Sequence, residues 1–278
     1  MFPIKKILFP VDFSEQCIGA SRFVEAMTGH FDAELVLLHV LGPLGYYGLP
    51  ETVEAAETPL AMFQRDEFRY FRVRRIVEKA DDATEKILAM SRAENIDLIM
   101  MPTIGIGRYR RFILGSVTAK VLHDSDCPVW TGVHLEHAPP LEALRIQNIV
   151  CAVDLKPHSE RVLEWAQQMS GEYQAALHVV HAIPAYEASP ASYFDAELRL
   201  NLEVEGKEAI RNLLHARGVE ATIHVHGGEV AHIVGCAAQR LRADLMVIGR
   251  GSENGLVGRL RSNAYSIIRQ SSCPVISV

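Results

Sequence analysis

Short apolar runs alternate with amphipathic segments along the whole chain. In the first half, ILFPV (residues 7–11), ELVLLHV (34–40) and DLIMM (97–101) have the length of buried strands and are followed by polar or turn residues. DATEKILAMSRAEN (82–95) and GSVTAKVLHDS (115–125) carry apolar residues at helical spacing. Apolar strands separated by helices predict a doubly wound α/β fold, in which helices cover both faces of a parallel sheet.

The same order of segments occurs twice. The alignment of KKILFPVDFS (residues 5–14) with QNIVCAVDLK (147–156) places Asp12 on Asp154. Later matches follow in chain order: His39 on His181, IDLIMMP (96–102) on ADLMVIG (243–249), and Cys127-Pro128 on Cys273-Pro274. We therefore predict two tandem parallel-sheet domains, residues 1–137 and 145–278, related by an internal pseudo-twofold. The connection contains Pro139-Pro140.

The two halves differ in one long segment. Residues 196–218 of the second half predict a clear helix, whereas residues 43–71 of the first half are less regular. Parallel sheets of this class bind ligands at the carboxyl ends of their strands, near the point where the strand order reverses. Asp12 ends the first strand at this edge, where a carboxylate could accept hydrogen bonds from ribose hydroxyl groups.

Composition narrows the classes of function. The net charge of −6 argues against broad attraction to nucleic acid or acidic membranes, so any anion site must be local. Five cysteines without a CxxC pair favour a reduced, cytoplasmic protein. The start MFPIKKILFPVDFS is interrupted by Pro10 and Asp12, so we expect no signal peptide. No apolar stretch is long enough to predict a membrane-spanning helix.

The segment TIGIGRYRRFILGS (residues 103–116) is the strongest candidate for binding chemistry. Gly105 follows a strand, and Gly115-Ser116 opens the next helix, where free backbone N–H groups and the helix dipole favour an anion. Arg108, Arg110 and Arg111 could contact a terminal phosphate. The alternative is a tight turn in a basic surface loop, with Ser116 only capping the helix.

Both halves resemble the universal stress protein family over almost the whole chain. The resemblance rests on ILFPVDFS (residues 7–14), LLHV (37–40), the loop 102–116 and SVTAKVLHDSDCPV (116–129). It implies Rossmann-like domains of the adenine nucleotide alpha hydrolase-like type that bind ATP, alone or with Mg²⁺, in stress response or signalling. Carried over to this sequence, the family's contacts to adenosine fall on Pro10, Val11, Asp12 and Val40, and those to phosphate fall on Gly105, Gly115, Ser116 and Val117.

The family's glycine motif, Gly-x-x-Gly-x9-Gly-Ser/Thr, is incomplete in both halves. Pro102 stands at the first glycine, which removes an N–H donor and fixes φ. In the second half, Gly249 and Gly251 are separated by one residue, and Arg261 precedes Ser262 where glycine is expected. We therefore expect nucleotide binding mainly in the first half, with weak or absent binding in the second.

The sequence favours a binding protein over an enzyme. It lacks GxxxxGK[ST], HExxH and GxSxG, so we assign no catalytic residue and expect at most slow ATP hydrolysis. His178, His181, His224 and His226 lie in predicted strands, where ordinary hydrogen-bonded histidines are more common than zinc ligands. No metal ligand is therefore assigned.

The rival to nucleotide binding is a nucleotide-free scaffold or chaperone-like protein, and an occluding Pro102 would favour it. The family resemblance implies pairing of the two halves within one chain through their last strands. A homodimer and an unidentified protein partner are compatible with the sequence.

Overall fold

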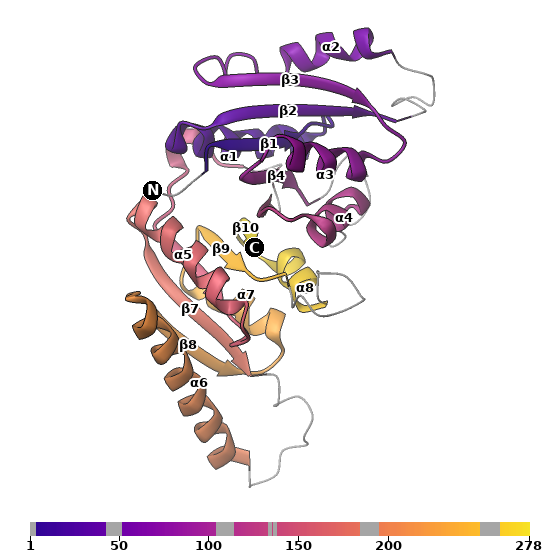
Figure 1. The fold of residues 1–278 in the computed structure, drawn as a ribbon. Helices are drawn as coiled ribbons and strands as arrows, with labels where there is room; N and C mark the ends of the chain where they lie inside the picture. The colour runs from indigo at the N-terminus through magenta and orange to yellow at the C-terminus, as the bar shows by residue number, and fades with distance from the viewer. Residues whose placement is uncertain are drawn as a thin grey trace. The chain divides into compact units, whose positions relative to one another are not determined.

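The computed structural model describes residues 4–42, 52–103, 114–132, 135, 138–183, 195–250 and 262–278. The chain divides into two compact units, one ending at Leu144 and the other spanning Arg145–Val278. The predicted α/β architecture is confirmed in both of them (Figure 1).

Unit 1 contains five described parallel strands in the order β3-β2-β1-β4-β5. Its elements are β1 (Lys6–Pro10), α1 (Glu15–Phe31), β2 (Glu34–Leu41), α2 (Val53–Met62), β3 (Arg72–Lys79), α3 (Ala83–Ala93), β4 (Leu98–Pro102), α4 (Ser116–Asp124), β5 (Val129–Gly132) and the 3₁₀ turn η2 (Leu141–Ala143).

Unit 2 repeats this order as β8-β7-β6-β9-β10, again with parallel pairing. Its elements are β6 (Asn148–Ala152), α5 (Ser159–Tyr173), β7 (Ala176–Ile183), α6 (Asp195–Arg217), β8 (Thr222–Gly227), α7 (Val230–Arg240), β9 (Leu245–Ile248), α8 (Ser262–Gln270) and β10 (Val275–Ser277). The helix predicted over residues 196–218 is α6.

The central strands are apolar because both of their faces are covered. Ile7, Leu8 and Phe9 of β1 are fully buried, as are Ile149 and Val150 of β6. In unit 1 the chain runs outward from β1 to β2 and β3, then returns to the other side of β1 as β4. In unit 2 the corresponding reversal lies between β6 and β9. These two positions are the topological switch points at which α/β sheets bind ligands.

In each unit, one aspartate accepts hydrogen bonds from the backbone at the start of the first strand. Asp97 Oδ2 accepts hydrogen bonds from the backbone N–H groups of Lys5 and Lys6, at 2.8 and 2.9 Å. Asp244 Oδ2 accepts the same pair of bonds, from Gln147 at 2.8 Å and from Asn148 at 2.9 Å. The carboxylates thus replace ladder partners where the strands begin, and the duplication has kept the arrangement.

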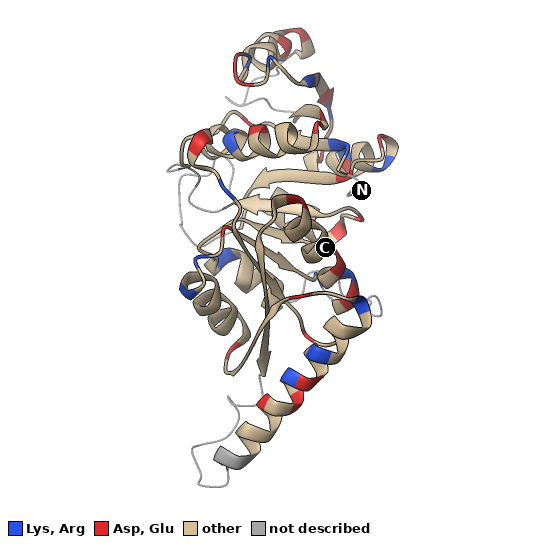
Figure 2. Cartoon of the chain, turned by 90° about the vertical axis from the view of Figure 1, so that its left-hand side faces the viewer, with Lys and Arg blue, Asp and Glu red and all other residues tan. Residues whose placement is uncertain are grey.

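The segment before the outer strand differs between the units. In unit 1, α2 contains Pro59, which removes a helical hydrogen bond and explains the irregular sequence pattern. In unit 2, the longer α6 closes on the sheet through Gly206, where an added Cβ would lie 3.1 Å from Val225 Cγ1. Figure 2 shows acidic and basic residues interspersed along this helix, so α6 presents no surface of a single charge sign.

Among the described helices, none is both long enough and apolar enough to cross a bilayer.

Candidate functional site

The chain turns sharply at the carboxyl end of β1. Asp12 Oδ1 accepts hydrogen bonds from Ser14 N at 3.0 Å and from Ser14 Oγ at 2.7 Å, while Ser14 caps the start of α1. Between them, Phe13 adopts a left-handed backbone with φ 60°. Such a conformation is uncommon for a bulky residue and is held here by the hydrogen bonds around it. Because β1 is a central strand, the turn holds the Asp12 carboxylate at the switch point.

Unit 2 builds the same turn after β6. Asp154 Oδ1 accepts from Lys156 N at 3.1 Å and from Ser159 Oγ at 2.9 Å, and Leu155 has φ 59°. The Nε2 atom of His158 also lies 3.4 Å from Asp154 Oδ1. The aligned position in unit 1 is Gln16, so the imidazole beside the carboxylate belongs to unit 2 alone.

A histidine on the neighbouring strand supports each turn. His39 Nδ1 lies 2.7 Å from Val11 O, and His181 Nδ1 lies 2.9 Å from Val153 O. These contacts give the aligned histidines a common structural role, in which the ring binds the carbonyl group that precedes the aspartate. The register of β1 with β2 ends with Pro10 opposite Leu38, and Val11 N donates to Leu38 O at 2.8 Å, so Val40 lies two residues beyond the last registered pair.

The start of α4 is attached to the end of β4. Gly115 is the N-cap of α4, and its N–H donates to Thr103 O at 2.8 Å. Because that donor is already used, a phosphate here would be bound by the N–H groups that follow it, on Ser116 and Val117. Among the described residues no side chain caps the helix, and Ser116 is exposed. The first turn therefore keeps the donors and the dipole that favour an anion.

Pro102 is the last residue of β4 and is buried. Backbone N–H groups of a strand alternate between its neighbours, and Ile99 and Thr103 donate theirs toward β5, at 3.0 and 3.2 Å. The nitrogen of Pro102 therefore faces β1, beyond the last registered pair of those strands, Leu8 with Ile99. Proline thus fits this position without breaking the described ladder. Its carbonyl group accepts from Thr118 Oγ1 at 3.0 Å, a second link between β4 and α4.

An ion pair also positions α4. Lys120 Nζ of α4 lies 2.9 Å from Asp82 Oδ2, and Asp82 caps α3 by accepting from Thr84 N at 2.7 Å. The Lys120 ammonium and then the Thr84 hydrogen bonds lower the pKa of Asp82 to about 2. The carboxylate therefore stays ionised at neutral pH and keeps the two helices in contact.

The structure places seven of the eight predicted site residues and brings them to one edge of unit 1. Pro10 is the last residue of β1, Val11 and Asp12 follow it, Val40 lies near the end of β2, and Gly115, Ser116 and Val117 open α4. The eighth residue, Gly105, lies outside the described residues, as do Arg108, Arg110 and Arg111. Gly251, Arg259 and Arg261 of unit 2 lie outside them as well.

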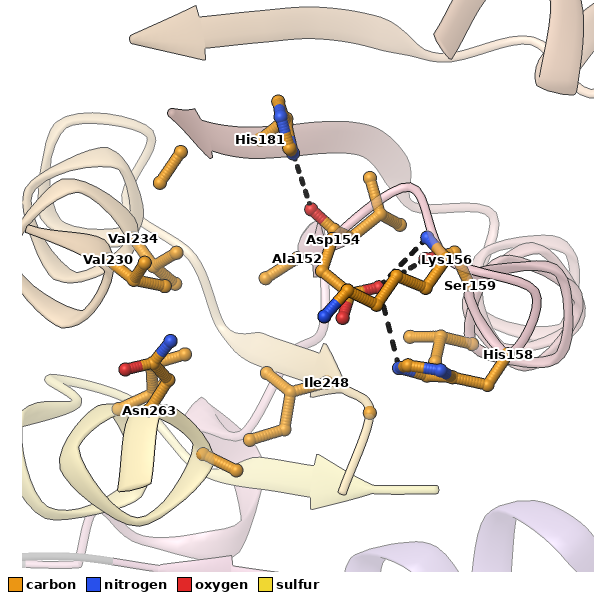
Figure 3. A pocket seen from close by; sticks show the side chains of 16 residues that line it. Ala152, Asp154, Lys156, His158, Ser159, His181, Val230, Val234, Ile248 and Asn263 are labelled. Atoms are coloured by element: carbon orange, nitrogen blue, oxygen red, sulfur yellow. Dashed lines mark hydrogen bonds and ion pairs between the residues drawn. The ribbon is translucent and has the colours of Figure 1, made fainter. Parts of the chain in front are cut away.

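Unit 2 contains a cavity of about 210 Å³ at its own switch point. Figure 3 shows Asp154 with Lys156, His158 and Ser159 on one side, Val230 and Val234 on the other, and Ile248 between them. Sites for organic ligands are typically about 300–1,000 Å³, so the described residues enclose space for part of such a ligand. An apolar wall facing a carboxylate suits a flat ring joined to hydroxyl groups.

Gly249 forms part of the cavity wall at the position aligned with Pro102. A Cβ added there would lie 3.0 Å from His158 Cδ2 and 3.1 Å from Val162 Cγ2. Unit 1 has proline in place of this glycine and the smaller Ala20 in place of valine. The two units therefore differ at this position. Unit 1 has the ring of Pro102 on the strand, and unit 2 has the larger side chain of Val162 on the helix.

Sequence reasoning missed the contribution of His158, because nothing in its sequence pattern indicates a contact with Asp154. It also did not anticipate a cavity in unit 2. Aligning the two halves did provide a signal for His39 and His181, which occupy equivalent positions.

Comparison with known proteins agrees with the duplicated fold. The model of the universal stress protein family matches residues 3–131 and 145–278. The chain belongs to the universal stress protein family. It is a tandem member, since each unit matches the family model separately.

Curated relatives align with half of the chain. "Universal stress protein A homolog 1" of Coxiella burnetii is 33% identical over 143 residues, covering 49% of this chain and 97% of the relative. "Universal stress protein MJ0577" of Methanocaldococcus jannaschii is 29% identical over 150 residues, covering 45% of this chain and 92% of the relative. Both relatives thus match about the length of one unit of this universal stress protein.

Solved structures extend the likeness to the whole chain. A universal stress protein from Archaeoglobus fulgidus has a TM-score of 0.70 and 22% identity, covering 99% of this chain and 98% of its own. A functionally unknown protein, PA1789, from Pseudomonas aeruginosa has a TM-score of 0.73 and 22% identity, covering 99% of this chain and 92% of its own. At this identity the likeness shows a shared tandem fold.

Proposed function

We propose that this universal stress protein binds an adenine nucleotide, ATP alone or as its magnesium complex, mainly in unit 1. One observation carries the proposal. The Asp12 carboxylate and the start of α4 follow two adjacent strands, β1 and β4, at the carboxyl edge of the sheet, where they flank the switch point. A carboxylate suits ribose hydroxyl groups, and helix N–H groups suit phosphates, so this edge offers both at once.

The family resemblance supplies the roles proposed for the individual residues. Pro10, Val11 and Val40 would contact the base and the sugar, Asp12 would bind the ribose, and Ser116 and Val117 would donate N–H groups to phosphate. Gly105 and the bare backbone at Gly115 would leave room for the phosphate. Members of this family commonly bind adenine nucleotides, which supports the choice of ligand.

Unit 2 has a separate observation in its favour. Its cavity combines Asp154 with an apolar wall, which suits the base and ribose of the same ligand. On the phosphate side, Arg261 replaces the glycine aligned with Gly115. Unit 2 is therefore proposed to bind ATP more weakly than unit 1.

The proposed biological role is nucleotide-dependent stress response or signalling in the cytoplasm, with hydrolysis at most slow. The alternative is a nucleotide-free scaffold or chaperone-like protein. It would gain support if Pro102 blocked the proposed site of unit 1.

Mass spectrometry of the small molecules released by denaturing the purified full-length chain tests the ligand class. We expect an adenine nucleotide in the released fraction, and less of it from an Asp12→Ala variant purified in parallel. Release of no adenine compound, combined with no uptake of added ATP, would support the scaffold alternative.

A further inference from the structure

The ring of His158 lies between the two strand ends that flank the switch point of unit 2. Its Nε2 atom is 3.4 Å from Asp154 Oδ1, which follows β6 (Figure 3). On its other side lies Gly249, which follows the adjacent strand β9. A Cβ atom added to Gly249 would be 3.0 Å from His158 Cδ2 and 3.3 Å from His158 Nε2. The imidazole therefore fills the space between the carboxylate and the end of β9.

The start of α5 explains why the ring lies there. α5 begins at Ser159, and His158 is its N-cap but makes no side-chain hydrogen bond to the helix. In unit 1, α1 begins at Glu15, so the aligned residue Gln16 lies inside the first turn of its helix. The later start of α5 leaves His158 in the turn after β6, where its side chain is 21% exposed and projects towards Asp154. The two units thus differ here in backbone as well as in residue type.

The cavity beside this ring is small and largely apolar. Its volume of about 210 Å³ lies below the range of about 300–1,000 Å³ that is typical of sites for organic ligands. Two of its lining residues, Gly249 and Ala264, are smaller than their counterparts Pro102 and Thr118 in unit 1. In unit 1 the Thr118 hydroxyl group donates to Pro102 O at 3.0 Å. Unit 2 has neither the hydroxyl group nor the proline ring, so this wall of the cavity suits an apolar ring.

The polar groups of the cavity suit an uncharged ligand. Figure 3 shows Asn263, from the first turn of α8, on the opposite side of the cavity from Asp154. Its amide both donates and accepts hydrogen bonds without a charge, whereas the aligned residue of unit 1 is Val117. Lys156 is exposed, and its backbone N–H group is the part that donates to Asp154, at 3.1 Å. The described lining therefore offers partners for hydroxyl groups and for the edge of a base.

In unit 1, a ligand can pass directly from the carboxylate to the start of α4, because β1 and β4 are adjacent. In unit 2, the ring of His158 occupies the corresponding passage between Asp154 and the end of β9. We infer that unit 2 is a site for an uncharged nucleoside, from which His158 excludes the phosphate chain of a nucleotide. The inference rests on the adenine specificity proposed above, and it gives the two units different ligands.

Calorimetric titrations of the full-length chain with adenosine and with ATP test the nucleoside site. We expect about two adenosine molecules but about one ATP per chain. Asp12→Ala removes the ribose acceptor of unit 1, so one adenosine site should remain in this variant. Adding Asp154→Ala should weaken that remaining site at least about tenfold, because the ribose loses its hydrogen bonds to a charged group.

His158→Gln, which gives unit 2 the residue of unit 1, isolates the role of the ring. Combined with Asp12→Ala, it should raise the affinity for ATP at least about tenfold and leave the affinity for adenosine nearly unchanged. His158→Phe is the matched control, because its ring fills the passage without a hydrogen bond to Asp154 and should still exclude ATP. The melting temperature of each variant shows whether it is folded.

Two outcomes would overturn the inference. One is a single adenosine site per wild-type chain, and the other is an affinity for ATP that His158→Gln leaves unchanged. Failure of the wild-type chain to bind ATP would contradict the proposed function instead. The adenosine titrations of Asp12→Ala, with and without Asp154→Ala, would still decide whether unit 2 binds a nucleoside.

Discussion

Replacing Gly115 with arginine is expected to weaken ATP binding at least about tenfold, while adenosine binding stays nearly unchanged. The change gives unit 1 the residue that unit 2 has at the aligned position, Arg261. Gly115 has φ −58° and ψ 147°, a conformation open to any residue, so the variant should fold. Its side chain would enter the space next to the N–H groups of Ser116 and Val117.

Two effects of this arginine oppose each other. Its charge attracts phosphate, which is worth roughly 1 kcal/mol where solvent reaches the pair. Displacing the phosphate from the helix start loses several hydrogen bonds to a charged group, each worth about 1.5–3 kcal/mol. Since about 1.4 kcal/mol is a factor of ten in affinity, the steric effect should prevail. Gly115→Ala is the matched control, because a methyl group is short and cannot accept a hydrogen bond from the N–H groups of the first turn.

Asp12→Ala, unlike Gly115→Arg, should weaken the binding of adenosine and the binding of ATP to unit 1 alike. A carboxylate can accept several hydrogen bonds at once, as Asp12 does from the N–H and hydroxyl groups of Ser14, and it suits ribose hydroxyl groups. Asp12→Asn keeps an acceptor for Ser14 and separates loss of the turn from loss of the charge. Calorimetry of each variant with both ligands provides the measurement. If Gly115→Arg kept full ATP affinity, the start of α4 would not be the phosphate site.

The largest expected loss of stability outside the apolar core comes from Asp97→Ala. This change removes the acceptor for two backbone N–H groups at the start of β1. Hydrogen bonds to a charged group contribute about 1.5–3 kcal/mol each, and partial exposure reduces that value. We expect a loss of roughly 2–4 kcal/mol in the free energy of unfolding of unit 1, seen as a lower melting temperature.

Asp97→Asn is the control, since its amide oxygen can still accept from Lys5 and Lys6. Hydrogen exchange of the Lys6 amide locates the effect, because this proton should lose protection in Asp97→Ala. Asp244→Ala should produce the equivalent loss in unit 2, at Asn148. Equal stability of Asp97→Ala and the wild type would show that the carboxylate does not anchor the strand.

Much of the fold was predictable because each unit is built from apolar runs that end in turn residues. The predicted helix over residues 196–218 is observed as α6, and the predicted strand ILFPV overlaps β1. The helix α2 was harder to predict from the sequence, because Pro59 interrupts its helical pattern. β3 is the outermost described strand of its unit and half-exposed, which explains the polar sequence RVRRIVEK.

The residues of the candidate site could be predicted only where they directly follow a predicted strand. Asp12 and Asp154 could be read from the repeat, because each directly follows a central strand. Contacts between distant segments could not be read in this way. His158 meets Asp154 through the turn into α5, and His178 meets His224 through the register of β7 and β8. Sequence reasoning gave the strand histidines an ordinary hydrogen-bonding role, which fits His181 and His226.

Calorimetric titration of the full-length chain with ATP tests the central claim most directly. The two units differ at the phosphate side, with Gly115 in one and Arg261 at the aligned position in the other. We therefore predict saturable binding of about one ATP per chain. Two equivalent sites per chain would contradict the asymmetry between the units, and no saturable binding at millimolar ATP would contradict nucleotide binding itself.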